Sequence, residues 1–450
     1  MKAFIYLLTS VLMLSSFAEK PNILFIAVDD LNDWAGYRGN QQVLTPNMDK
    51  LASQSVWFSE AYCQYPVCGP SRASVMSGLY YHDLKLQKLQ AQDTDVAKQA
   101  RKIGSGLIHE YFNSYGYKTM ASGKILHKHL SKKGLDESAS RGSWDFNRDE
   151  KGEKVKTNFH SDDTLTDWDY FKKPESEMSD FKTAAWAVEK LKEKHEKPFF
   201  LMAGFLRPHV PWYVPRKYFD MYDINKLVLP QYKADDLDDV SEAAKSTLNK
   251  GYPRTEWAIQ QNQWKKIIHS YMASITFADA QIGKILDALE NSPYHKNTIV
   301  VLWSDHGYHM GEKNTFQKHT LWERSAAVPL IIKVPGMTRG AKCSGTVQLI
   351  DIYPTLLDLC GLPAAEKLKG RSLKPLLQKP NSEWPYPAFT YRKDGGKSVQ
   401  SGQYRFIEYG DGSQELYNHA VDPREWTNLI NNPEYKDTVK KLKSLITGNK

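Results

Sequence analysis

Cysteine and long apolar runs are both scarce in this chain of 450 residues. Its four cysteines, Cys63, Cys68, Cys343 and Cys360, are too few for a dense disulfide framework. After the first twenty residues no stretch is long and apolar enough to predict a membrane span. Internal repeats and nucleic-acid-binding motifs are also lacking, so we expect no nucleic-acid partner. The formal charge of +8 is compatible with a polyanionic substrate and equally with an ordinary basic surface.

The N-terminus has the features of a signal peptide. Lys2 supplies a positive charge, residues 4–14 are apolar, and Ser16-Phe17-Ala18 fits a small-x-small cleavage site. The apolar run is too short for a transmembrane helix. The sequence therefore predicts that residues 1–18 are removed and that the protein is exported, to the periplasm or the medium.

The rest of the chain predicts an α/β fold, because apolar runs alternate with helical patterns. Strands are expected at 22–28, 117–121, 198–205, 298–303 and 328–334, and helices at 106–114, 181–193 and 264–290. This alternation favours a large, mostly parallel sheet between helices, in a catalytic domain over residues 19–380. Short strands at 398–409 and 415–418 predict a small antiparallel sheet with a final helix, in a C-terminal subdomain over 381–450. The polar segments 138–166 and 232–254 are expected to wall a cleft.

The segment Cys68-Gly69-Pro70-Ser71-Arg72 is the most informative in the chain. Pro70 suits the first position of a helix, which would place Cys68 at the helix mouth, where free N–H groups favour anions. Arg72 adds a guanidinium fork suited to sulfate or phosphate oxygens. A buried thiol at an ordinary loop-to-helix junction explains the segment about equally well when it is taken alone.

Polar side chains follow four of the predicted strands, where the carboxyl ends of a parallel sheet meet. Each case alone has an ordinary explanation as a turn, a cap or a solvated side chain, but their coincidence with Cys68 favours a site. The side chains are Asp29-Asp30, Lys124 with His127, Arg207 with His209, and Asp305-His306, followed by Lys318 and His319. Asp29, Asp30 and Asp305 offer oxygen ligands for a divalent cation, most simply calcium. His306 as a fourth ligand leaves magnesium or manganese open.

These motifs together resemble the type I sulfatases, over nearly the whole chain after residue 20. The resemblance rests on the C-x-P-S-R motif and on these segments: Pro21 through Asp30, Thr45-Pro46-Asn47-Met48-Asp49, Gly123-Lys124, Ser304-Asp305-His306-Gly307, and Asp422-Pro423-Arg424-Glu425-Trp426-Thr427-Asn428-Leu429. Within the family the iduronate-2-sulfatase branch is the most similar. Lys124 and His127 lie three apart, Arg207-Pro208-His209-Val210-Pro211 is similar to the K-P-H-I-P of that branch, and Asp305-His306 replaces a usual Asp-Asn.

The resemblance implies an alkaline-phosphatase-like sulfatase fold and a set of roles. A sulfatase-maturing enzyme would oxidise Cys68 to formylglycine, whose hydrate attacks sulfur and which also contacts the metal. Arg72 would support that hydrate, Lys124 and Lys318 would bind sulfate, and His127 would help to regenerate the aldehyde. His209 would protonate the leaving group. The implied substrates are sulfated oligosaccharides, from glycosaminoglycans or marine algal glycans.

Three other functions stay open from the sequence. A phosphonate or phosphate-ester hydrolase could use the same fold and a similar nucleophile. A thiol enzyme could use unmodified Cys68, whose pKa a helix terminus can lower. A non-catalytic binder of sulfated glycans would need no nucleophile, so the intact set of candidate residues argues against it.

Overall fold

The computed structural model describes residues 20–86, 88–89, 91–337 and 340–448; the predicted signal peptide lies outside them. An eight-stranded sheet runs through the molecule in the order β11-β2-β10-β9-β1-β7-β4-β5. Its strands are β1 (Asn22–Asp29), β2 (Val56–Phe58), β4 (Lys118–Gly123), β5 (Glu137–Ser138), β7 (Phe199–Pro208), β9 (Thr298–Ser304), β10 (Leu330–Lys333) and β11 (Ala341–Cys343). Only β10 runs antiparallel to its neighbours, so the predicted, mostly parallel sheet is confirmed.

The three central strands are buried along their whole length, which explains their continuous apolar sequences. Successive side chains of a strand point to opposite faces of a sheet. In β1, Ile23, Phe25 and Ala27 accordingly pack into one apolar layer, whereas Leu24, Ile26 and Val28 pack into the other. The sheet is therefore covered on both faces.

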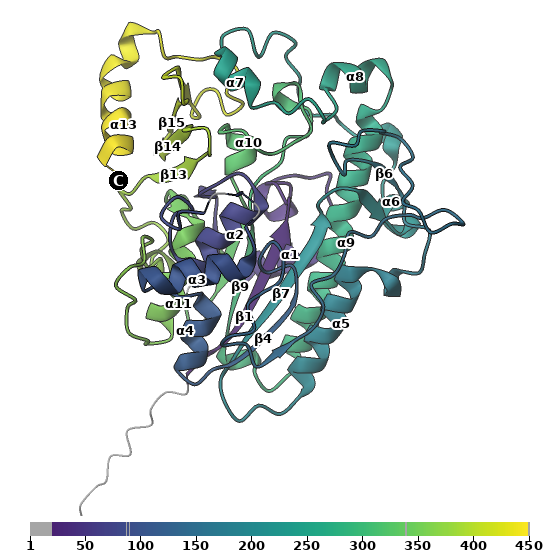
Figure 1. The fold of residues 1–450 in the computed structure, drawn as a ribbon, viewed down its shortest axis with the longest axis vertical. Helices are drawn as coiled ribbons and strands as arrows, with labels where there is room; N and C mark the ends of the chain where they lie inside the picture. Colours follow the sequence, from purple (N-terminus) through teal and green to yellow (C-terminus); the bar gives the residue numbers. More distant parts are fainter. Residues whose placement is uncertain (1–19, 87, 90, 338–339, 449–450) are drawn as a thin grey trace, which may run out of the picture.

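Each face of the sheet has its own set of helices (Figure 1). One face packs against α2 (Cys68–Ser77), α3 (Asp93–Ile103), α4 (Ile108–Ser114), α11 (Ile352–Leu359) and α12 (Lys374–Gln378). The other packs against α1 (Pro46–Ser53), α5 (Ser179–Lys192) and the long α9 (Trp264–Glu290). The observed bounds of α9 are those expected from its apolar periodicity. None of the described helices is long and apolar enough to cross a membrane.

A four-stranded antiparallel sheet follows near the C-terminus, as predicted. It consists of β13 (Ala388–Tyr391), β14 (Lys397–Ser401), β15 (Tyr404–Glu408) and β16 (Gln414–Asn418), and α13 (Lys436–Gly448) packs against it. The first of these strands, β13, was not expected from the sequence. Buried Arg405 of β15 pairs with Glu323 and Glu425, which joins this sheet to the main body. The domain boundary after residue 380 stays a prediction.

Short elements complete the connections, and most of them lie outside the main sheet. They are α6 (Arg216–Phe219), α7 (Glu242–Ser246), α8 (Thr255–Gln260), α10 (Glu323–Ala326), β3 (Ala61–Tyr62), β6 (Trp168–Tyr170), β8 (Trp212–Val214) and β12 (Val347–Gln348). All four cysteines are buried and free, so no disulfide joins any of these elements.

One local prediction was wrong. Pro70 is the third residue of α2 and not the first, because the helix begins at Cys68, and the Ser71 amide donates to the Val67 carbonyl at 3.0 Å. The missing N–H of Pro70 still falls in the first turn, where amides have no partner within the helix. The shift makes Cys68 itself part of the helix N-terminus.

Candidate active site

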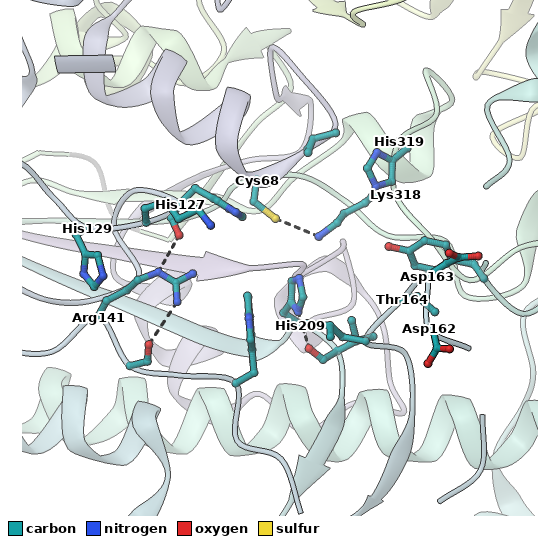
Figure 2. A pocket seen from close by; sticks show the side chains of 17 residues that line it. Cys68, His127, His129, Arg141, Asp162, Asp163, Thr164, His209, Lys318 and His319 are labelled. Atoms are coloured by element: carbon teal, nitrogen blue, oxygen red, sulfur yellow. Dashed lines mark hydrogen bonds between the residues drawn. The ribbon is translucent and has the colours of Figure 1, made fainter. Parts of the chain in front are cut away.

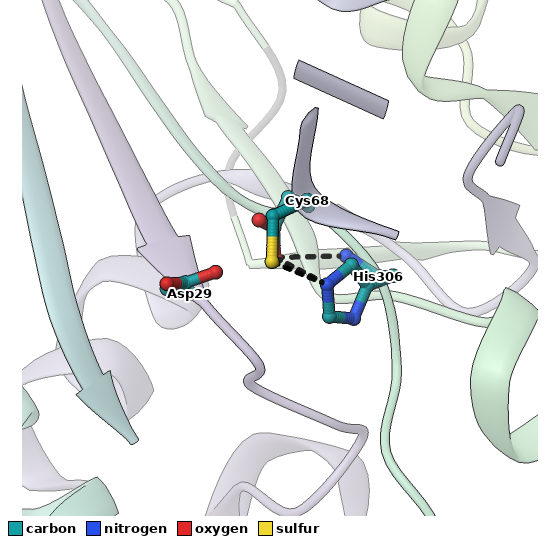
Figure 3. A group of neighbouring side chains, drawn as sticks. Asp29, Cys68 and His306 are labelled. Atoms are coloured by element: carbon teal, nitrogen blue, oxygen red, sulfur yellow. Dashed lines mark hydrogen bonds and ion pairs between the residues drawn. The ribbon is translucent and has the colours of Figure 1, made fainter. Parts of the chain in front are cut away.

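The carboxyl ends of the parallel strands bring the predicted polar residues together at the N-terminus of α2. Asp29 ends β1 with Asp30 beside it, Lys124 follows β4, and Asp305 and His306 follow β9. The Asp30 amide donates to Asp305 Oδ1 at 3.2 Å, which ties the ends of β1 and β9 to each other. Figure 3 shows the Cys68 side chain between Asp29 and His306.

Cys68 is buried at the centre of this group. Its Sγ lies 3.2 Å from His306 Nε2, 3.0 Å from Lys318 Nζ and 4.0 Å from Asp30 Oδ1. Burial by itself would raise the pKa of the Cys68 thiol, but Lys124, Lys318 and His306 outweigh it and hold the pKa well below its usual range. The position therefore favours a negatively charged or strongly polarised group.

Three buried cation–carboxylate pairs surround Cys68. Lys124 pairs with Asp29, Lys318 Nζ lies 2.6 Å from Asp30 Oδ1, and Arg72 Nε lies 2.7 Å from Asp305 Oδ2. Burial and the charge on Cys68 raise the pKa of Asp29, but Lys124, His209 and Arg72 outweigh both and hold it well below its usual range. Asp29 is therefore kept ionised, whereas burial raises the pKa of Asp305 to about 7 although Arg72 and His306 oppose the shift.

The carboxylates also retain lone pairs for a cation. Asp29 Oδ1 and Asp30 Oδ2 are buried and accept no hydrogen bond from the described residues. Buried acceptors are normally satisfied, so these two oxygens fit a site that binds a cation. Potential ligand atoms lie within 4.8 Å of one another in two overlapping groups: Asp29, Cys68, Asp305 and His306, and Asp29, Asp30, Cys68 and His209. The set of donors, rich in oxygen, fits a hard divalent cation.

Two histidines flank the group on the side of a cavity. The ring of His127 hydrogen-bonds to the Cys68 side chain, and burial lowers the pKa of this histidine. His209 Nδ1 lies 2.6 Å from the Val210 carbonyl, which can only accept, so Nδ1 carries the proton. Its Nε2 then faces Asp30 Oδ2 at 3.9 Å. The His209 ring stacks on Trp144 with 4.2 Å between the ring centres.

A cavity of about 430 Å³ opens over Cys68 (Figure 2). The two polar segments expected to wall a cleft do so: residues 141, 142, 144 and 162–165 of the first and Tyr252 of the second line it. Its floor contains Cys68, His127, His209 and Lys318. The cavity therefore gives a ligand access to Cys68 and to the predicted histidines and lysine beside it.

Of the two remaining predicted residues, Arg207 lies apart from the cavity and His319 belongs to it. Arg207 is buried and donates to the backbone carbonyls of Tyr213, His209 and Asp145, so it supports the turn of His209 and does not line the cavity. His319 does line the cavity, next to Lys318.

Sequence reasoning missed Trp144 and Arg141. The Trp144 ring packs against His209 and lies 4.9 Å from Lys124 Nζ, and Arg141 lies over the same ring at 5.3 Å. Both belong to the weakly patterned segment 138–166, where no periodicity shows which side chains turn inward. A tryptophan within a polar segment was the one available signal.

Comparison with known proteins agrees with this geometry. The Sulfatase family model matches residues 21–362, and the model described as N-sulphoglucosamine sulphohydrolase, C-terminal, matches residues 311–450. The chain is 40% identical over 451 residues to a Formosa agariphila protein named sulfatase, covering 95% of this chain and 86% of the relative. It is 30% identical over 397 residues to Mus musculus iduronate 2-sulfatase, covering 78% of this chain and 70% of the relative.

Two solved structures show the same fold. A protein in complex with its substrate D-glucosamine-2-N,6-O-disulfate superposes with a TM-score of 0.74 at 21% identity, covering 96% of this chain and 97% of the other. A phosphonate monoester hydrolase from Silicibacter pomeroyi superposes with a TM-score of 0.75 at 19% identity, covering 95% and 94%.

The fold and the site thus define a hydrolase of the alkaline-phosphatase-like sulfatase fold. The chain belongs to the sulfatase family and is a sulfuric ester hydrolase, as its motifs predicted.

Proposed function

We propose that this sulfatase is an exported enzyme that cleaves sulfate esters of carbohydrates, with formylglycine at position 68 and one divalent cation. The observation that carries the proposal is the setting of the Cys68 side chain, at a helix N-terminus and in contact with Lys318 and His306. Charged groups are not expected around an ordinary buried thiol, because each of them costs free energy to desolvate. A nucleophile that attacks a sulfate ester requires nearby cations, because they stabilise the negative charge of the sulfate.

Formylglycine would place two hydroxyls of its hydrate where Sγ of Cys68 lies. One hydroxyl attacks sulfur and gives its proton to the carboxylate of Asp30, whose Oδ1 lies 4.0 Å from Sγ, and the bond between sulfur and the bridging oxygen breaks as the alcohol departs. Lys124 and Lys318, fixed by Asp29 and Asp30, neutralise the oxygens of the transferring sulfate. Arg72 holds Asp305 in place from the following turn of α2.

Asp29, Asp30, Asp305 and His306, with the residue at position 68, would hold the cation, and we expect calcium. When bound, the cation supplies Lewis acidity and a fixed position for the sulfate. The two unsatisfied oxygens of Asp29 and Asp30 support this assignment.

His209 would donate the proton that the leaving alcohol needs from Nε2. The Val210 carbonyl holds the Nδ1 proton, so the form that donates is the imidazolium, with a second proton on Nε2. His127 then takes the proton of the second hydroxyl, the carbon–oxygen bond to sulfate breaks, and the aldehyde is restored. Its hydrogen bond to the Cys68 side chain supports this role.

The substrate class is a sulfated oligosaccharide, attacked at or near a non-reducing end. A walled cavity of about 430 Å³ supports a short substrate over a long polymer. The iduronate 2-sulfatase relative supports a sugar. The sequence of residues 1–18 supports export to the periplasm or the medium, and the maturing enzyme is a further partner.

A phosphonate or phosphate-ester hydrolase is the second candidate, because a phosphonate monoester hydrolase shares the fold at a TM-score of 0.75. We expect the pure enzyme to release sulfate from a panel of sulfated oligosaccharides faster than it cleaves the matching phosphate and phosphonate monoesters. Released sulfate and phosphate are measured by ion chromatography. Faster cleavage of the phosphorus esters would favour the second candidate, and activity on aryl sulfates with none on any sugar would contradict the carbohydrate assignment.

Maturation is tested at residue 68. Peptide mass spectrometry of active enzyme should find the aldehyde or its hydrate in place of the Cys68 thiol. Cys68→Ala should abolish turnover, whereas Cys360→Ala, away from the cavity lining, serves as the matched control. Full activity in a preparation that contains only unmodified cysteine would instead support the thiol enzyme.

The cation is tested by removal and return. Dialysis against EDTA should lower kcat by about 10³-fold or more, because the sulfate and the nucleophile lose their common anchor. Calcium should restore the activity better than magnesium or manganese, and elemental analysis should find one ion per chain, which Asp305→Ala loses. Unchanged activity of a metal-free enzyme would refute the assignment.

The role of His209 is tested with two kinds of leaving group. His209→Ala should lower kcat on sugar sulfates by about 10²–10⁴-fold and on activated aryl sulfates far less, because a good leaving group departs without a proton. His295, a histidine remote from the cavity, gives the matched control variant His295→Ala. Equal losses on both substrates would move the acid role to His319 or His127.

A further inference from the structure

One wall of the cavity is basic, and its residues have no part in the mechanism proposed above. Lys128, His129 and Arg141 line it, and Figure 2 shows His129 and Arg141 on one side of Cys68, with Asp162 and Asp163 on the other. Arg141 and Lys128 are half-buried, and His129 is exposed. The cavity is therefore polarised, with cations on one side of the nucleophile and carboxylates on the opposite side.

Arg141 is held rigidly by neutral groups. Its Nε donates to the His127 carbonyl at 2.7 Å, and its Nη1 contacts the Gly142 carbonyl at 3.3 Å. The guanidinium also lies over the Trp144 ring, 5.3 Å from its centre. These contacts fix its position, and no hydrogen bond from Nη2 to another described residue is formed.

The charge of Arg141 has no counter-ion, unlike the cations around Cys68. Lys124, Lys318 and Arg72 each pair with a carboxylate, whereas no carboxylate of the described residues lies within 4.0 Å of the Arg141 guanidinium nitrogens. Lys128 and His129 are likewise outside every ion pair formed by those residues. Partly desolvating an unpaired cation costs free energy, and a bound anion would recover it.

Two carboxylates lie near enough to act on the charge of Arg141: Asp29, which is paired with Lys124, and Asp93, at the start of α3. Asp93 Oδ2 accepts the Lys128 amide at 2.7 Å, so the carboxylate is turned to the backbone. Burial raises the pKa of Asp93 to about 7, so it carries only part of a charge near neutral pH. Asp93 does not neutralise the basic wall.

The basic wall lies close to the sulfate-binding residues. The Trp144 ring contacts Lys124 and Arg141, and the carbonyl that Arg141 binds belongs to His127, whose ring contacts Cys68. An anion at Arg141 would thus lie beside the ester under attack, on the side away from Asp162 and Asp163.

We propose that Arg141, assisted by Lys128 and His129, forms a second anion subsite, which binds a carboxylate or a second sulfate on the sugar whose ester is cleaved. This inference rests on the proposed carbohydrate sulfatase function and narrows it to substrates with two anionic groups. The guanidinium fork suits both groups, since each offers two oxygens in one plane.

Arg141→Gln tests the subsite by the ratio of kcat/KM on substrates with and without a second anionic group. The substrates are a monosulfated methyl uronoside, its carboxyl-reduced counterpart and a disulfated methyl glycoside. For the wild type, kcat/KM should be higher on the two substrates with a second anion. The variant should lower this preference about 10–100-fold, mainly through KM, because it removes charged hydrogen bonds to the bound substrate. If Arg141→Gln lowers kcat/KM more on the uronoside, the natural group is a carboxylate. If it lowers kcat/KM more on the disulfated glycoside, the natural group is a second sulfate.

Two further variants separate binding from structure. Arg141→Lys should restore part of the preference, because it keeps the charge without the fork. Arg148→Gln, which removes an exposed arginine of the same segment outside the cavity, should keep the wild-type preference. If Arg141→Gln lowers kcat/KM equally on all three substrates, Arg141 only positions His127 and the subsite is refuted.

Failure of the proposed function gives a different result. If the wild type releases no sulfate from any sugar but does hydrolyse an aryl sulfate, the carbohydrate assignment is wrong. The subsite is then tested by inhibition of aryl sulfate hydrolysis with glucuronate and with glucose. Stronger inhibition by glucuronate that Arg141→Gln abolishes would support the anion subsite, and equal inhibition by the two sugars would overturn it.

Discussion

The site around Cys68 depends on the pairing of buried aspartates with buried lysine and arginine side chains. Asp29, Asp30 and Asp305 are buried, and Lys124, Lys318 and Arg72 pair with them in the interior. Removing one member of a buried pair leaves an uncompensated charge, which typically costs about 3–5 kcal/mol. The elements that carry these six residues are thereby tied to one relative arrangement.

The sheet makes that arrangement possible because it is parallel at its centre. The carboxyl ends of β1, β4, β7 and β9 meet at one edge, so residues almost 300 positions apart in the chain become neighbours. The strands below them are buried along their whole length. The candidate catalytic groups thus come from the scaffold, while much of the cavity wall comes from the segments between its elements.

The residues at the strand ends and the residues of the cavity wall would have different tasks, the first in the reaction and the second in substrate selection. Under the proposed function, the residues around Cys68 would bind the sulfate group, whatever molecule carries it. Trp144, Arg141 and Tyr252 come from the connecting segments and line the cavity, where they would contact the rest of the substrate. Changes in these segments other than at Trp144, whose ring contacts Lys124 and His209, would alter the cavity wall and leave the buried ion pairs in place.

The sequence alone determined the layout of the scaffold and the candidate residues. Apolar runs such as 22–28 and the 27-residue periodic stretch of α9 encode burial directly, and short motifs mark the residues at the strand ends.

Only the tertiary structure decided which of those residues meet. Arg207 was expected to follow a strand as His209 does, yet it lies within β7 and turns to backbone carbonyls in the interior. Arg141 and Trp144 lie in a segment without periodicity, and their place in the cavity is set by contacts with His127, Lys124 and His209. Local patterns record how deeply a residue is buried, whereas the partner of a buried charge is chosen by packing between distant parts of the chain.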